Sequence, residues 1–135
     1  MVEFSQAVDL PWTAARADDP RIKWIARDHT KPGRPAAEAW VLHATLEWTR
    51  AHLEDSKEQV GQAMLAAALE LVGISAPIMT IQSHRWLYAL VDRPIGEDCP
   101  YEDGVGICGD GLLGGRIESA MVAGLALANR ILGDR

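Results

Sequence analysis

The chain has 135 residues, of which 48% are hydrophobic and 24% charged, and its 19 acidic and 13 basic side chains give a net charge of −6. Such a length and composition fit one globular domain with its own core and exclude an intrinsically disordered chain. No run of Lys and Arg is longer than two, so we expect no nucleic-acid partner. The apolar stretches are too short to span a bilayer and no secretory leader is visible, so we expect a cytoplasmic protein without a membrane partner.

The first part of the sequence predicts strands. They are expected at residues 2–8, 21–28 and 38–44. In the second of these strands, charged residues alternate with Ile22, Trp24 and Ala26, which would place these three side chains on one face. Pro32 and Gly33 predict a turn before the third strand, because proline presets one backbone angle and glycine is free to take the next.

Two helices should follow. A short one is expected over residues 46–53. Asp55-Ser56 is followed three positions later by Glu58-Gln59, which is the spacing of a capping box, where side chains satisfy the free backbone donors at a helix start. A helix over residues 57–72 therefore fits, and Gly73 supplies its end.

The second part of the sequence mixes strand, loop and helix. Alternating side chains predict one or two strands over 78–90, followed by a loop over 92–103, a strand over 104–109 and a helix over 116–132. The fold class is therefore α+β, with an antiparallel sheet of about five to six strands and two to three helices. We expect a single compact unit with two parts, residues 1–100 and residues 101–135.

The richest motif is a cluster of glycines near the C-terminus. The pattern GxGxxG occurs there twice, with its first glycine at Gly104 and again at Gly109. The second copy should follow a strand and open a helix, but the next parallel strand and ribose-binding acid of a dinucleotide fold are missing. What remains is a strand, Gly109-Asp110, a glycine-lined turn and a helix.

This remaining arrangement suits a flavin. Glycines let the backbone approach a flat ring closely, and the free N–H groups at a helix start favour a place where negative charge develops. Asp110 would then accept a hydrogen bond from a ribityl hydroxyl. The alternative is a glycine-rich turn in which Asp110 only caps the following helix.

The histidines and cysteines predict no metal site. The four histidines have neither HxxxH nor HExxH spacing, and Cys99 and Cys108 lie nine positions apart without a CxxC pattern. Free thiols are the natural interpretation for a cytoplasmic protein. A single disulfide between the two cysteines remains the alternative.

The terminal motif, Gly-Ile-Cys-Gly-Asp followed by Gly-Gly-Arg-Ile-Glu, is similar to the C-terminal FAD motif of bacterial renalase-like flavoproteins, which are relatives of the monoamine oxidases. Further blocks resemble this family in the family's order. They are Trp24–Arg27, Lys31–Arg34, Trp40–Thr45, Trp48–Glu54 and His84–Trp86. The resemblance covers residues 20–132 and corresponds to roughly the last two-fifths of a full-length member.

The resemblance implies a two-domain flavoprotein of the FAD/NAD(P)-binding fold. Residues 1–100 would form part of the substrate cavity, with Trp86 and Tyr101 in its lining, and residues 101–135 would close over FAD. The alternative for Trp86 is an ordinary core aromatic on a strand. The cofactor-binding residues carried over from the motif are Gly109, Asp110, Gly115, Arg116, Ile117 and Glu118. One departure is Gly111, where many members carry a bulky aromatic residue.

The implied chemistry is that of an FAD-dependent amine oxidase. The parent protein would transfer a hydride from an amine or dihydronicotinamide substrate to FAD and then pass the electrons to O2, which needs no catalytic acid or base. Because the half that holds most of the FAD is not in the sequence, the chain alone should be inactive and should bind FAD weakly or not at all. Its partner would be that missing half. The alternative is a stand-alone, non-catalytic module that self-associates as a homo-oligomer.

Overall fold

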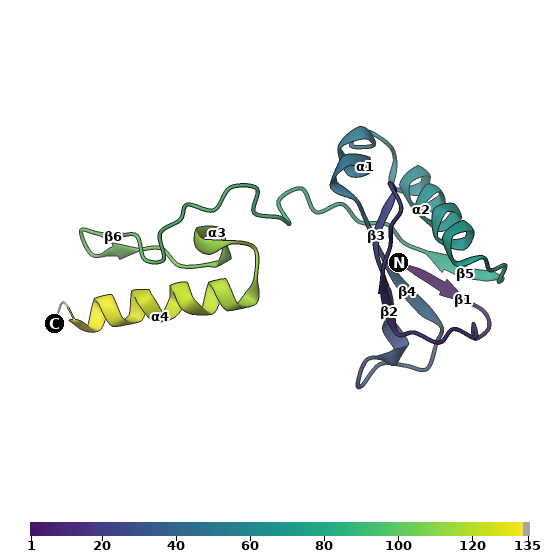
Figure 1. The fold of residues 1–135 in the computed structure, drawn as a ribbon, viewed down its shortest axis with the longest axis horizontal. Helices are drawn as coiled ribbons and strands as arrows, with labels where there is room; N and C mark the ends of the chain where they lie inside the picture. Colours follow the sequence, from purple (N-terminus) through teal and green to yellow (C-terminus); the bar gives the residue numbers. More distant parts are fainter. Residues whose placement is uncertain (134–135) are drawn as a thin grey trace. The chain divides into compact units, whose positions relative to one another are not determined.

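The computed structural model describes residues 1–133 and divides the chain into two units (Figure 1). The N-terminal unit comprises Met1–Arg85, and the C-terminal unit begins at Trp86. The sequence places the change between its two parts later, at residues 100 and 101, within one compact unit. Within residues 1–133, no helix combines the length and apolarity that crossing a membrane requires.

The N-terminal unit is built on a five-stranded antiparallel sheet, which confirms the predicted α+β class. Its strands are β1 (Val2–Phe4), β2 (Ala14–Arg16), β3 (Ile22–Arg27), β4 (Ala39–Ala44) and β5 (Ile78–Ile81). They are arranged in the order β2-β3-β4-β1-β5. The strand predicted at residues 2–8 is shorter than expected, and β2 was not predicted.

Three helices accompany this sheet: the 3₁₀-helix η1 (Asp28–Thr30), α1 (Leu46–Ala51) and α2 (Lys57–Val72). The predicted capping box is confirmed at the start of α2. The Ser56 hydroxyl accepts the Gln59 N–H at 3.2 Å, and the Gln59 side chain accepts the Ser56 N–H at 2.9 Å. The predicted end is also confirmed, because Gly73 takes a left-handed conformation with φ of 71° and donates its N–H to the Leu69 carbonyl.

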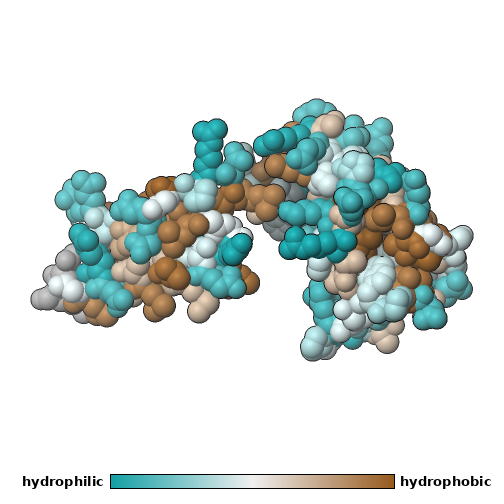
Figure 2. Space-filling view, viewed as in Figure 1, coloured by the Kyte–Doolittle hydropathy of each residue, from teal (hydrophilic) through white to brown (hydrophobic). Residues whose placement is uncertain are grey.

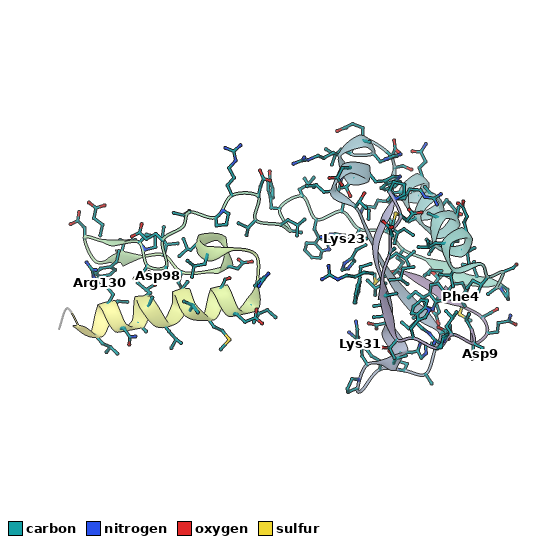
Figure 3. The ribbon with its side chains drawn as sticks, viewed as in Figure 1. Phe4, Asp9, Lys23, Lys31, Asp98 and Arg130 are labelled. Carbon is teal, nitrogen blue, oxygen red and sulfur yellow. The ribbon has the colours of Figure 1, made fainter. Side chains whose placement is uncertain are left out.

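The core of the N-terminal unit lies between α2 and the sheet. The buried side chains that form it are Val2, Phe4, Ile22, Ile25, Trp40, Met64, Leu65, Ala67 and Ala68. Trp40 is fully buried, and its ring meets the ring of Phe4 edge to face at 4.9 Å. Phe4 is labelled on β1 in Figure 3.

A bulge changes which face of β3 is buried. The pairing of β3 with β4 shifts register between Ile22 and Trp24, so one extra residue is inserted into β3. As a result Ile22 and Ile25 both enter the core, whereas Trp24 is only half-buried. Trp24 and Ala26 share a face as predicted, but Ile22 lies on the face of Ile25, so the prediction is wrong at Ile22.

The C-terminal unit contains a two-stranded hairpin and two helices. Its elements are β6 (Tyr101–Glu102), β7 (Val105–Gly106), α3 (Asp110–Leu113) and α4 (Ile117–Gly133). The chain thus has four α-helices within residues 1–133, more than the two to three expected. The helix predicted over residues 116–132 is α4, and α3 was not predicted.

Two strand predictions in the second part of the chain are corrected. Only Ile78–Ile81 is a strand in the region 78–90, so the alternation that continues through Tyr88 forms no sheet face. The strand predicted over 104–109 is β7 alone, because the chain has just turned at Asp103 and Gly104.

The turn between β6 and β7 explains why the strand is so short. Asp103 has φ of 49° and Gly104 has φ of 80°. Positive φ at both central residues is the signature of a type I′ turn, which joins two antiparallel strands through two residues. The hairpin pairs Tyr101 with Gly106 and Glu102 with Val105.

Candidate functional site

The six residues predicted to bind a cofactor lie close together because they belong to one continuous segment. Gly109 precedes α3, Asp110 is its first residue, and Gly115 and Arg116 join α3 to α4. Ile117 and Glu118 are the first residues of α4. We call residues 109–119 the glycine turn. It lies wholly within the C-terminal unit.

The backbone of the glycine turn takes conformations that other residues rarely adopt. Gly109 has φ of 147° and Gly114 has φ of 130°. An added Cβ at either position, or at Gly111, would meet no atom within 4 Å, so the space beside this backbone is open. The glycines are therefore required by conformation at two positions, and they leave the chain approachable by a flat molecule.

The start of α4 offers unused hydrogen-bond donors. The N–H of Ala120 donates to the Arg116 carbonyl, which closes the first turn of the helix. Within residues 1–133, the N–H groups of Ile117, Glu118 and Ser119 have no protein acceptor. These three donors and the positive end of the helix dipole favour an acceptor atom that carries negative charge.

Asp110 precedes these donors in the glycine turn, and its carboxylate is exposed. Its backbone carbonyl accepts the Gly114 N–H at 2.8 Å, which fixes α3 as a single turn. The carboxylate itself makes no hydrogen bond to any residue in the described range, and Gly109 rather than Asp110 occupies the cap position of α3. The capping role that the sequence left open for Asp110 is thus not what its side chain does.

The two residues predicted to line a substrate cavity lie in different settings. Tyr101 is in β6, where its ring lies 6.0 Å from the Arg130 guanidinium of α4. Figure 3 labels Arg130 on that helix. Trp86 lies outside any helix or strand, and its side chain is 75% exposed.

An open groove of about 400 Å³ lies in the N-terminal unit, between the start of α2 and the end of β5. Its lining residues are Lys57, Glu58, Gly61, Gln62, Ile81, Gln82 and Ser83. The Ser83 hydroxyl donates to the Lys57 carbonyl at 2.8 Å and ties the two sides together. None of these residues was singled out from the sequence as a site.

A buried ionic cluster was also missed. Glu38 accepts hydrogen bonds from the Arg27 guanidinium, the Trp40 indole N–H and the Val8 backbone N–H. Burial would raise the pKa of Glu38, but the hydrogen bonds from Arg27, Trp40 and Val8 outweigh it and lower the pKa to about 2. Both oxygens of Glu38 accept hydrogen bonds from these N–H groups, so we interpret this cluster as a structural clamp and not as a reactive site.

His29 lies beside this clamp. Its Nδ1 is 3.6 Å from the Glu38 Oε1 and is buried without a hydrogen-bond partner. Because the clamp already occupies both Glu38 oxygens, His29 is held near the carboxylate without sharing its hydrogen bonds.

The described residues bring together no cluster that could hold a metal ion, and both cysteines are free thiols. The arrangement best suited to a ligand is therefore the glycine turn, which combines open backbone, three free N–H donors and an exposed carboxylate. No protein-family model matches the chain.

Proposed function

We propose that this chain is the C-terminal segment of a flavin-dependent oxidoreductase similar to the renalase-like amine oxidases, and that its glycine turn contacts FAD. The observation that carries the proposal is the set of free N–H groups at Ile117, Glu118 and Ser119, placed directly after a glycine-lined turn with an exposed Asp110. The ordered blocks from Trp24 to Glu118 support the same parentage.

The residues of the glycine turn fit one part of FAD. Free N–H groups at a helix start suit the pyrimidine edge of the flavin, where negative charge collects on reduction. The Asp110 carboxylate suits a ribityl hydroxyl, since a charged acceptor makes the stronger kind of hydrogen bond. When bound, FAD would supply hydride acceptance from an amine or dihydronicotinamide and reoxidation by O2.

The cofactor would need a second half to hold its pyrophosphate. In dinucleotide-binding proteins that task falls to a glycine-rich loop between a strand and a helix, followed by a further parallel strand. Within residues 86–133, the strands pair only with each other, in an antiparallel hairpin. The proposed holder of the pyrophosphate is therefore a dinucleotide-binding half outside these 135 residues.

The test is to isolate the protein from the cell that makes it, with any chain or segment attached, and to measure flavin released on denaturation. We expect FAD together with a dinucleotide-binding half. Asp110→Ala should weaken FAD retention roughly tenfold to a hundredfold, because a hydrogen bond to a charged group contributes about 1.5–3 kcal/mol. The matched control is Glu102→Ala in the nearby hairpin, which should retain FAD. Recovery of the protein without flavin contradicts the proposal.

A second candidate function is that of a stand-alone module that self-associates. It is favoured by the outer face of α4, where apolar side chains recur at intervals of four and seven residues. These are Ile117, Met121, Leu125 and Leu132, each more than 60% exposed. Figure 2 shows hydrophobic residues gathered on the C-terminal unit. Exposed apolar stripes of this kind drive association.

Light scattering on the purified chain separates the two candidates. A self-associating module should show a mass of two or more chains, and Met121→Glu combined with Leu125→Glu should return it to one. A flavoprotein segment would instead use this face to pack on the missing half, so the same double variant would lose that partner and its FAD. A monomer that never binds FAD in any context contradicts both.

A further inference from the structure

The two cysteines of the chain lie on opposite arms of the β6–β7 hairpin. The hairpin pairs Glu102 with Val105 and Tyr101 with Gly106. The next rung is the hydrogen bond from the Ile107 N–H to the Pro100 carbonyl at 3.0 Å. Continuing this register by one position places Cys99 directly opposite Cys108.

Pro100 explains why residues 100 and 107 share only one hydrogen bond. The second bond of this pair would need a backbone N–H at residue 100, and proline has none. The rung from Ile107 still holds the two arms together next to the cysteines. Because hydrogen-bonded and non-hydrogen-bonded pairs alternate, and residues 100 and 107 form the hydrogen-bonded kind, Cys99 and Cys108 fall at a non-hydrogen-bonded pair.

That position suits a disulfide. Residues opposite each other at a non-hydrogen-bonded pair have Cα atoms about 4.5 Å apart and point their side chains to the same face. A disulfide spans Cα atoms about 4.4–6.8 Å apart. Both thiols are also within reach of a small reagent, since Cys99 is half-buried and Cys108 is exposed.

We propose that Cys99 and Cys108 are a redox-active pair that forms a disulfide across the base of the β6–β7 hairpin. With hydrogen peroxide as the oxidant, one thiol loses its proton, and its thiolate attacks one peroxide oxygen; the O–O bond breaks, the sulfur gives up two electrons and becomes a sulfenic acid, and hydroxide leaves. The second thiol also loses its proton and attacks the sulfenic sulfur, so that the S–S bond forms, the S–O bond breaks and a second hydroxide leaves; the two released protons convert both hydroxides to water. A cellular thiol restores the two cysteines by exchange.

The disulfide would act on the glycine turn through the backbone. Cys108 is followed directly by Gly109, whose φ of 147° starts the turn. Closing the hairpin at Cys108 fixes the residue from which that turn departs, so the oxidised chain has a less mobile glycine turn than the reduced chain. This inference rests on the hairpin register alone and is independent of the proposed flavin function.

The test treats the purified chain with an equimolar amount of hydrogen peroxide and maps the products by mass spectrometry. Cleavage after glutamate separates Asp98–Glu102 from Asp103–Glu118, and each fragment carries one cysteine. We expect these two fragments to remain joined until a reductant is added. Before cleavage, the covalent mass of the oxidised protein should be that of one chain. In a glutathione buffer, the equilibrium constant for forming the disulfide should be at least about tenfold larger in the folded chain than in the chain unfolded by urea.

Two variants keep the result interpretable. Cys99→Ser and Cys108→Ser should each leave a single thiol that oxidises to sulfenic and sulfinic acid, or joins two chains, and neither should give the linked fragments. If the wild-type chain behaves as these variants do, or forms the link equally well in urea, the hairpin does not pair its thiols and the inference is overturned. An unchanged fold in both variants is checked by circular dichroism.

Discussion

Arg27 and Glu38 meet in a bidentate ion pair that is almost shielded from solvent. The Arg27 Nε lies 3.0 Å from Glu38 Oε1, the Arg27 Nη2 lies 2.9 Å from Glu38 Oε2, and the two side chains are 11% and 3% exposed. The same guanidinium donates to the backbone carbonyls of Val8 and Leu10. The pair therefore fastens the segment between β1 and β2 to the sheet.

Glu38→Gln should destabilise the N-terminal unit by about 3–5 kcal/mol, because removing one partner leaves a buried charge uncompensated. Urea unfolding followed by tryptophan fluorescence measures this, since four of the five tryptophans lie in Met1–Arg85. The matched control is Glu70→Gln. Glu70 pairs with Arg21, but its side chain is 70% exposed, so its loss should cost about 0.5 kcal/mol. Equal losses in both variants would mean that the Arg27–Glu38 pair is not a clamp.

Stability should also fall in acid. The pKa of Glu38 drops from its ordinary 4.5 to about 2, and hydrogen bonds from Arg21 lower the pKa of Asp19 from 3.8 to about 2. Lowered carboxyl pKa values contribute stability that is fully present above pH 4.5 and is lost as pH falls toward 2. Each pKa unit corresponds to about 1.4 kcal/mol, so the buried Glu38 alone contributes on the order of 3 kcal/mol.

The urea midpoint of the wild-type chain should therefore be lower at pH 3 than at pH 6. Glu38→Gln should show a much smaller difference between the two pH values, because it has already lost the larger titrating group. A midpoint that is the same at both pH values in the wild type would show that Glu38 and Asp19 are not held ionised by folding.

Helix α2 could be predicted because its signals are local. The capping pair Ser56 and Gln59 and the stop at Gly73 all lie within one turn of the helix ends. The ends of the strands are harder to predict from the sequence, because pairing with a neighbouring strand decides where each strand stops. β5 ends at Ile81, opposite Val2, and the residues up to Tyr88 form no strand. The alternation through Tyr88 had no strand to pair with.

The candidate site was predictable to the extent that it is continuous in sequence. Gly109 to Glu118 are neighbours along the chain, so any fold keeps them close. The Arg27–Glu38 clamp joins residues eleven positions apart, and nothing in either residue's surroundings predicts the contact. For the β6–β7 hairpin, a signal existed: Asp103-Gly104 is a typical type I′ turn sequence, but the glycine run that follows suggested one longer strand.

Ser56→Ala should destabilise α2 by about 1 kcal/mol, the usual effect of removing a capping side chain. The hydroxyl of Ser56 is the acceptor for the Gln59 N–H, so alanine leaves that donor without its partner. The matched control is Ser75→Ala, at an exposed position outside any helix, which should leave the free energy of unfolding unchanged. Urea unfolding at neutral pH compares the two variants, and equal stability in both would contradict a stabilising cap.

Gly104→Ala should weaken the β6–β7 hairpin by roughly 1–2 kcal/mol, because alanine is strained at the φ of 80° that this turn requires. The matched control is Gly111→Ala in α3, where φ is not positive and a new Cβ meets no atom within 4 Å. Hydrogen exchange at the Ile107 amide reports the last rung of the hairpin, which it makes with Pro100.

The Ile107 amide should exchange faster in Gly104→Ala than in the wild-type chain, and its exchange rate should be unchanged in Gly111→Ala. Because Cys99 and Cys108 lie just beyond that rung, the same variant should also form the disulfide less readily than the control. Protection of Ile107 that survives Gly104→Ala would show that the rung does not depend on the turn. The pairing of the two thiols would then need another cause.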